Sequence, residues 1–206
     1  MRIDGLCRTI LFALFVALFS VPLQSAEQTS GQILGGSLDA PIRIEVFSDF
    51  QCPHCRDLYL SVMRRVLADY SSKNKVCLIY HEFPLQAHPY SRKAALYVEA
   101  VSRLGQQQLL KVYDCLFTDQ AQWGEDGKVE VSIAKVLSRA DFEKLKKIMQ
   151  DPSISAAVDK EIRLGVQNKI ESTPTFYIYS GQKQLQKVAG DLSYVSLKNY
   201  LNGIIK

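Results

Sequence analysis

The sequence predicts an α/β fold in which an all-helical segment interrupts a small sheet. Two observations predict it. Apolar residues recur at helical spacing from Tyr90 to Asn168. Short apolar runs of β type lie on both sides of that segment, at 42–47, 76–83, 175–179 and 184–189. The chain has 206 residues, of which 47% are hydrophobic, enough for one sizeable core or for a core with an inserted subdomain.

The first half of the predicted fold is a β–α–β unit over residues 41–87. Pro41 opens the first strand, a helical pattern runs over 52–70, and a polar turn at 71–74 leads to the second strand. This order implies two parallel strands joined by a right-handed crossover. The polar, Gly-rich residues 27–40 are expected to form a flexible lead-in.

A helical insertion is expected over residues 88–172. Its breaks are expected at Gly105, Trp123-Gly124 and Asp151-Pro152. Residues 173–206 then return to the sheet as two strands around a tight turn and end in a helix, 194–204. Without the insertion the order is β–α–β, then β–β–α. With a Cys-x-x-Cys pair after the first strand, this order predicts a thioredoxin fold.

The first 26 residues have the anatomy of a secretory signal peptide. Arg2 and Arg8 form a basic start, residues 10–19 are almost all apolar, and the small residues Ser25 and Ala26 follow. An uncleaved membrane anchor is the alternative. Either interpretation predicts a periplasmic or other extracytoplasmic location. The net charge of +4 is too small to argue for a nucleic-acid partner.

The Cys52-Pro53-His54-Cys55 stretch lies at a predicted strand-to-helix corner. A helix N-terminus presents unpaired N–H groups and a partial positive charge, and both stabilise a thiolate. The pair therefore predicts a dithiol/disulfide redox centre. His54 is expected to stabilise the thiolate of Cys52, which makes the couple more oxidising. The alternatives are a structural bridge or half of a zinc site, which would need further ligands at suitable spacing.

The segment around this motif resembles the active-site signature of the DsbA-like thioredoxin-fold oxidoreductases, in the branch that carries "SDFQCPxC". The matching stretches are Phe47 to Cys55, His81 to Leu85, His88-Pro89, Leu116-Phe117 and Ser172 to Phe176. The resemblance extends over roughly 41–201.

This resemblance implies an exported enzyme that exchanges disulfides with reduced, unfolded proteins. Cys52 would be the exposed nucleophile and Cys55 the resolving cysteine. Thr173 and Pro174 would form a cis-proline loop that faces the disulfide and docks the substrate backbone. The family also implies a membrane redox partner, a quinone-linked oxidase, and neither a diffusible cofactor nor a metal.

Glu45 marks a departure from that family. Relatives often carry an acidic residue six positions before the first cysteine, as proton acceptor for the buried one, but Val46 holds that position here. One step along a strand reverses the face. Glu45 is therefore either a proton relay or a salt-bridge residue near Arg43. Asp49 and Glu82 are two further candidates for the relay.

Cys77 and Cys115 lie outside the signature. Export favours a second, structural disulfide between them, and the alternative is two small buried side chains.

Three functions remain open from the sequence. The leading one is a monomeric oxidase that introduces disulfides into reduced exported proteins. The second is a reductase or isomerase of envelope disulfides, held reduced by a membrane electron donor. The third is a chaperone-like binding module with incidental redox activity.

Overall fold

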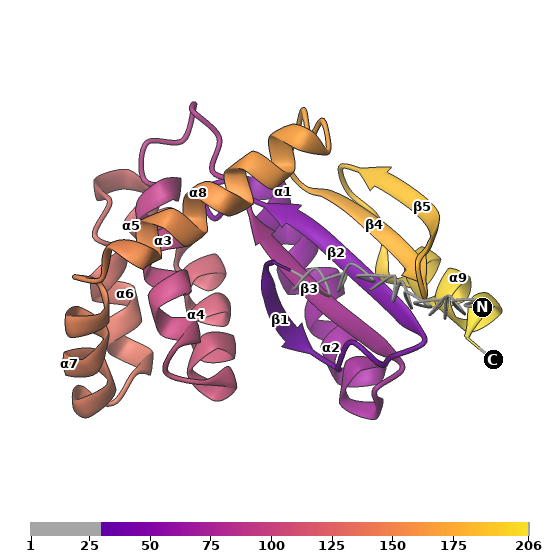
Figure 1. Ribbon diagram of the computed structural model, residues 1–206, viewed down its shortest axis with the longest axis horizontal. Helices are drawn as coiled ribbons and strands as arrows, with labels where there is room; N and C mark the ends of the chain where they lie inside the picture. Colours follow the sequence, from indigo (N-terminus) through magenta and orange to yellow (C-terminus); the bar gives the residue numbers. More distant parts are fainter. Residues whose placement is uncertain (1–29, 206) are drawn as a thin grey trace, which may run out of the picture.

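The computed structural model describes residues 30–205, and the predicted signal peptide lies outside this range. A five-stranded sheet with the order β1-β3-β2-β4-β5 forms the centre of the fold (Figure 1). The strands are β1 (Gln32–Gly35), β2 (Ile42–Ser48), β3 (Val76–Glu82), β4 (Thr175–Ser180) and β5 (Lys183–Ala189). The fold class predicted above, a thioredoxin fold with an inserted helical subdomain, is confirmed.

The strand register brings three chain segments to one edge of the sheet. β2 and β3 are parallel, with Ser48 opposite Glu82, and β4 runs antiparallel to β2, with Thr175 opposite Phe47. The ends of β2 and β3 and the start of β4 therefore meet. The redox motif follows β2 and the Thr173-Pro174 loop precedes β4, so this edge holds the site.

Strand β1 differs from expectation, because it lies within the lead-in that was expected to be flexible. Gln32 pairs with Tyr80 and Ile33 with Ile79 in an antiparallel ladder. Leu34 is 1% exposed and belongs to the main core. The short strand has an irregular register before Gly35. Four residues bordered by glycines give too weak a periodicity to stand out in the sequence.

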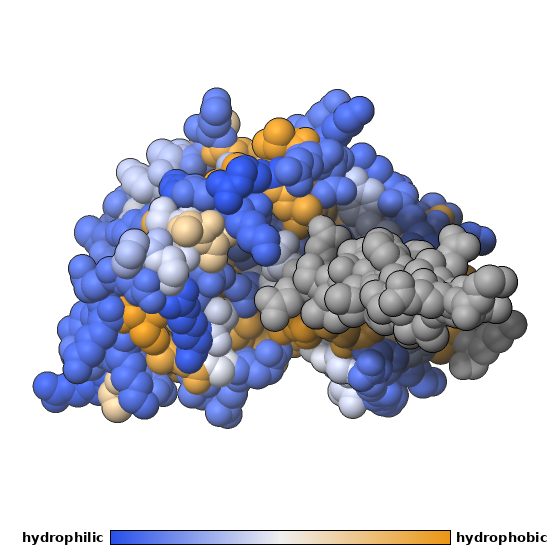
Figure 2. Space-filling view, viewed as in Figure 1, coloured by the Kyte–Doolittle hydropathy of each residue, from blue (hydrophilic) through white to orange (hydrophobic). Residues whose placement is uncertain are grey.

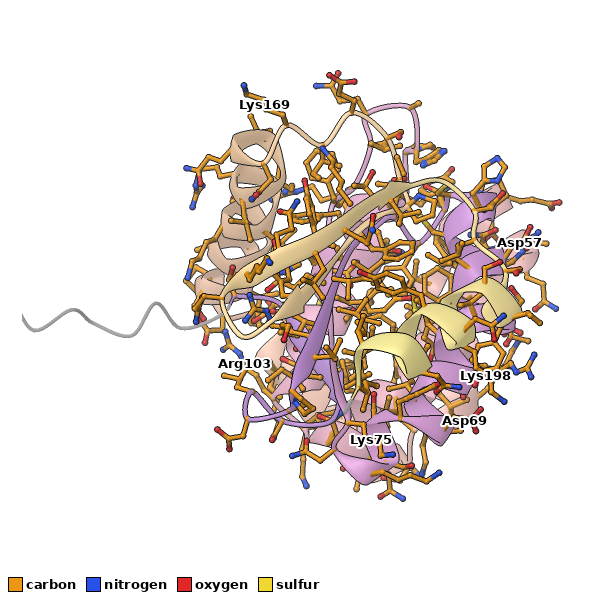
Figure 3. The ribbon with its side chains drawn as sticks, turned by 90° about the vertical axis from the view of Figure 1, so that its right-hand side faces the viewer. Asp57, Asp69, Lys75, Arg103, Lys169 and Lys198 are labelled. Atoms are coloured by element: carbon orange, nitrogen blue, oxygen red, sulfur yellow. The ribbon has the colours of Figure 1, made fainter. Side chains whose placement is uncertain are left out.

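Helices cover both faces of the sheet (Figure 3). The helical stretch after the motif comprises α1 (Pro53–Leu58), the π-helical turn η1 (Tyr59–Met63) and α2 (Arg64–Asp69), and the 3-10 turn η2 (Ser71–Lys73) follows it. This stretch and α9 (Tyr194–Ile204) lie on one face. Helix α8 lies on the other.

The insertion consists of six helices. They are α3 (Ser91–Ser102), α4 (Gln106–Thr118), α5 (Gln120–Asp126), α6 (Val129–Val136), α7 (Arg139–Ile148) and α8 (Pro152–Gln167). The break expected at Trp123-Gly124 is wrong. Helix α5 continues to Asp126 and ends at Gly127, whose φ of +71° suits glycine.

Helix α8 connects the insertion to the sheet (Figure 1). Gly165 allows its close approach, because a Cβ there would lie 2.3 Å from Phe83 Cδ2. Phe83 belongs to a second, smaller core with Phe47, Ile170 and Tyr177. Helix α8 therefore leads the chain into the Thr173-Pro174 loop from a fixed position.

Apolar side chains are exposed over the C-terminal part of α8 (Figure 2). Val166, on this helix, is 63% exposed. Within residues 30–205, no helix is both long and apolar enough to cross a membrane.

Candidate active site

The cysteine pair sits where the sequence predicts it, at the N-terminus of α1. Cys52 is the N-cap residue in an extended conformation, and Pro53 occupies the first turn, where a missing N–H costs nothing. The Arg56 N–H donates to the Cys52 carbonyl at 3.1 Å and closes that turn. Both cysteines are buried, Cys52 5% and Cys55 1% exposed, so Cys52 is not the exposed nucleophile that the resemblance implies. The two side chains are free thiols.

The environment lowers the pKa of Cys52 to about 5. The largest cause is a hydrogen bond from the Cys55 thiol, and backbone N–H groups of Cys55 and His54 add to it, while burial acts in the opposite direction. Cys52 is therefore a thiolate at neutral pH in the reduced protein. A stabilised thiolate is both a ready nucleophile and a good leaving group.

Cys55 has the opposite character. Burial raises its pKa well above the usual value, and the neighbouring Cys52 thiolate raises it further. The Asp49 N–H, 3.4 Å from Cys55 Sγ, lowers it in part. One reactive thiolate thus lies beside one protonated, protected thiol, the arrangement that disulfide exchange requires.

The structure brings Thr173 and Pro174 to the same site. The Thr173-Pro174 peptide bond is cis, as expected. Cys52 Sγ lies 3.3 Å from the Thr173 carbonyl oxygen. The Thr173 hydroxyl oxygen is buried and has no hydrogen-bond partner among the described residues. Pro174 contributes no N–H, but its carbonyl oxygen accepts from the Gly190 N–H at 2.8 Å.

His54 is placed differently from expectation. Its ring is exposed, and Nδ1 lies 3.0 Å from the Asp191 carboxylate, while its backbone N–H contributes to the lowered pKa of Cys52. Asp191, in the loop before α9, was missed by sequence reasoning. Its distance of 137 residues from His54 left no local signal.

Glu45 is not beneath the cysteines. Its carboxylate contacts Arg43 at 2.6 Å and lies 3.7 Å from His81 Nε2. Val46 and Cys55 belong to the main core on the other face of the sheet. The structure therefore corrects the relay role of Glu45 in favour of the salt bridge, because the strand alternates faces.

Glu82 is a buried acid on the cysteine side of the sheet. It accepts a hydrogen bond from the Tyr113 hydroxyl. Burial and the nearby carboxylates of Glu161 and Asp49 raise its pKa to about 8, although the hydrogen bond from Tyr113 acts in the opposite direction. Its carboxyl group is therefore mostly protonated at neutral pH.

Cys77 and Cys115 do not form the expected bridge in the structure, where both are free thiols. Cys77 lies on the face of β3 opposite to Leu78 and Tyr80, which pack with α4 in the main core. Cys115 faces α6 instead, and its thiol donates to the Ser132 carbonyl oxygen at 3.0 Å. The two sulfurs are therefore separated by the sheet.

In the part of the chain that the structure describes, no group of three or more His, Cys, Asp or Glu side chains is arranged to hold a metal ion.

Comparisons with known proteins agree with this geometry. A family profile described as thioredoxin matches residues 28–201. A probable disulfide bond formation protein D of Bacillus cereus is 29% identical over 147 residues, which are 69% of this chain and 68% of the relative. The disulfide bond formation protein D of Bacillus subtilis is 26% identical over 152 residues, which are 72% and 68% of the two chains.

Solved structures show the same fold. Wolbachia pipientis α-DsbA1 superposes with a TM-score of 0.69 at 18% identity, covering 82% of this chain and 88% of that one. Oxidised BdbD from Bacillus subtilis superposes with a TM-score of 0.65 at 24% identity, covering 84% and 96%.

A thioredoxin fold with a thiolate-bearing Cys-x-x-Cys pair beside a cis-proline defines a thiol:disulfide oxidoreductase. The chain belongs to the thioredoxin family. It is similar to the disulfide bond formation proteins D of Bacillus, and its fold is that of the DsbA structures.

Proposed function

We propose that this protein is an exported oxidase that introduces disulfides into reduced, unfolded proteins outside the cytoplasm. The observation that carries the proposal is the lowered pKa of Cys52, about 5, beside a Cys55 thiol whose pKa is raised. A stabilised thiolate favours the reduced enzyme, so the oxidised enzyme gives its disulfide away readily. The names of the Bacillus relatives, disulfide bond formation proteins, support this direction.

The reaction consists of two thiol–disulfide exchanges. A substrate thiolate attacks Sγ of Cys52 in the Cys52–Cys55 disulfide, a mixed disulfide forms, and Cys55 leaves and takes up a proton. A second substrate thiolate then attacks the substrate sulfur of the mixed disulfide and expels Cys52 as the thiolate. The substrate loses two electrons and the enzyme gains them.

Thr173 and Pro174 are the proposed substrate-binding residues. The Thr173 backbone lies next to Cys52 Sγ. An extended peptide could pair with this loop by strand addition and so present its cysteine to Cys52. In this proposal a membrane quinone-linked oxidase reoxidises the Cys52–Cys55 pair. Residues 1–26 act as an export signal, and the active protein is a monomer.

The test is the equilibrium of the Cys52–Cys55 pair against a glutathione redox buffer, measured by trapping free thiols. A reduction potential of about −120 mV, that of the strongest known disulfide donors, is expected. A potential of about −270 mV, that of thioredoxin, would contradict the oxidase and identify a reductase. The Cys52→Ala variant separates the chaperone-like alternative, because a binding module would still suppress aggregation of an unfolded protein without Cys52.

A further inference from the structure

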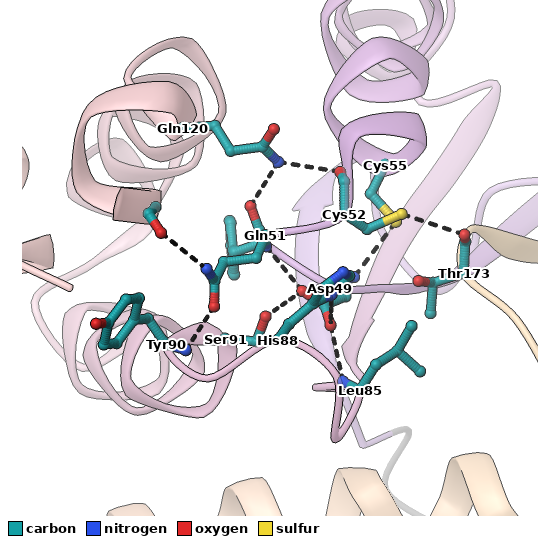
Figure 4. A network of polar contacts seen from close by, with 12 residues as sticks. Asp49, Gln51, Cys52, Cys55, Leu85, His88, Tyr90, Ser91, Gln120 and Thr173 are labelled. Atoms are coloured by element: carbon teal, nitrogen blue, oxygen red, sulfur yellow. Dashed lines mark hydrogen bonds and ion pairs between the residues drawn. The ribbon is translucent and has the colours of Figure 1, made fainter. Parts of the chain in front are cut away.

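The carboxylate of Asp49 is fully buried and accepts four hydrogen bonds (Figure 4). Oδ1 accepts from the Gln51 N–H at 2.7 Å and from the Ser91 hydroxyl. Oδ2 accepts from the Leu85 N–H at 2.7 Å and from His88 Nδ1 at 2.8 Å. Two of these donors are the backbone N–H groups of Gln51 and Leu85.

The backbone of the same residue holds both cysteines. The Asp49 N–H donates to Cys55 Sγ at 3.4 Å, and the Asp49 carbonyl oxygen accepts from the Cys52 N–H at 3.1 Å. Side chain and backbone together therefore connect the redox pair to residues 84–91, which follow β3 and include the first residue of α3. We call this segment the β3–α3 loop.

The β3–α3 loop is partly open to solvent. Gln86, Ala87 and Pro89 are exposed, whereas His88 is half-buried and Ser91 is buried. A buried carboxylate costs several kcal/mol unless it is fully hydrogen-bonded. Asp49 therefore holds the loop in place, and the loop in turn fixes the position of Asp49.

We propose that Asp49 is a positioning residue for disulfide exchange. Its carboxylate is hydrogen-bonded to the β3–α3 loop, and these bonds keep the Asp49 N–H directed at Cys55 Sγ. The N–H stabilises the thiolate of Cys55, the form that attacks the Cys52 mixed disulfide. In that step Cys55 releases its proton to the buffer, the bond between Cys52 and Cys55 forms, and the partner leaves as a thiolate. This role rests on the thiol–disulfide exchange proposed above, but not on whether the protein oxidises or reduces its substrates. A reduction potential like that of thioredoxin would therefore leave it intact.

An Asp49→Asn variant tests this role. The amide keeps one acceptor oxygen but replaces the other with an NH₂ group, which would face either the Leu85 N–H or the Gln51 N–H and repel it. The measurement is the decay of a preformed mixed disulfide between Cys52 and glutathione, followed by quenching and mass spectrometry. We expect decay about tenfold slower than in the wild-type protein, the size expected for a lost hydrogen bond.

The matched control is Asp57→Asn. It removes the same formal charge two residues after Cys55, but Asp57 is exposed and its carboxylate pairs with Arg56. We expect its decay rate to stay within about twofold of wild type, as for an exposed ion pair. If decay slowed equally in both variants, loss of a negative charge alone would explain the effect, and the proposal would be overturned.

His88 supplies a second test that keeps the carboxylate intact. His88→Ala removes one donor to Asp49, and His88→Asn keeps an N–H near the place of Nδ1. Slower decay in the Ala variant that the Asn variant restores is the expected result. Wild-type decay rates in both His88 variants and in a folded Asp49→Asn protein would overturn the proposal.

Discussion

The sulfur of Cys52 and the carbonyl oxygen of Thr173 lie 3.3 Å apart, although 121 residues separate them in the chain. Between them runs the helical insertion, and α8 leads from it into the loop that carries Thr173. The insertion therefore does more than cover the sheet. Its last helix sets where the Thr173 backbone stands relative to the reactive sulfur.

The lowered pKa of Cys52 depends first on Cys55, and this can be measured. In Cys55→Ala the hydrogen bond from the thiol is lost, so the pKa of Cys52 should rise from about 5 toward the usual value for a thiol. Cys55→Ser keeps a hydroxyl donor and should give a smaller rise. Thiolate absorbance against pH in both variants checks the order. Equal pKa values in the two variants would show that the helix N-terminus alone controls Cys52.

Glu82 should make the oxidised protein less stable as the pH rises. Its pKa is about 8 in the folded protein against an ordinary value of 4.5, so its stabilising effect is complete below about pH 4.5 and is lost as the pH rises through 8. Glu82→Gln keeps an acceptor for Tyr113 and cannot ionise. We expect its free energy of unfolding at pH 8 to exceed that of the wild-type protein by about 1–3 kcal/mol.

The oxidised form is used for this comparison because Cys52 and Cys55 do not titrate in it. Urea unfolding of both proteins at pH 5 and pH 8 gives the difference. If the gap between wild type and Glu82→Gln did not widen with pH, the raised pKa of Glu82 would be disproved.

The sequence is informative where a local pattern determines the structure. The step from strand to motif to helix was enough to place Cys52 and Cys55 at the N-terminus of α1. Strand alternation indicated that Glu45 faces away from the cysteines but left both of its roles open, and the contact with Arg43 decided between them. The contact of Asp49 with Leu85, by contrast, spans 36 residues and depends on how the loop after β3 folds back.

Cys77 and Cys115 show the same limit. Alternation predicts that Cys77 faces away from Leu78, but only the path of the insertion decides which face α4 covers. The cysteine count therefore could not choose between a bridge and two buried thiols.

Gly165 should be intolerant of a side chain. Alanine normally stabilises a helix interior relative to glycine by about 1 kcal/mol. At Gly165 the new Cβ would lie 2.3 Å from the Phe83 ring, so Gly165→Ala should instead lose about 1–3 kcal/mol through overpacking. Gly203→Ala in α9 is the matched control, since nothing among the described residues lies within 4 Å of its Cβ position. Denaturant unfolding of the two variants should give changes of opposite sign, and a gain in both would show that α8 can move away from Phe83 freely.

The ion pair between His81 and Glu161 should stabilise the packing of α8 against the sheet, by an amount that depends on pH. His81 Nδ1 lies 2.7 Å from the Glu161 carboxylate, and both side chains are buried. Burial opposes the charge on His81, but its hydrogen bond to Glu161 and the nearby Glu45 carboxylate prevail and raise its pKa to about 9. The raised pKa means that this contribution to stability is complete below about pH 6.5 and is lost as the pH rises through 9.

Glu161→Gln tests the pair, with Asp159→Asn as its control on the same helix. Asp159 pairs with Arg92 at 2.8 Å but both side chains are exposed, so its loss should cost at most about 1 kcal/mol. Removing Glu161 leaves a buried imidazolium with a weaker partner and should cost about 3 kcal/mol at pH 6. The cost should shrink by pH 9, where His81 is half deprotonated even in the wild-type protein. Two results would contradict a stabilising ion pair between a charged His81 and Glu161. One is an equal loss of unfolding free energy in the two variants, and the other is a loss in Glu161→Gln that does not change between pH 6 and pH 9.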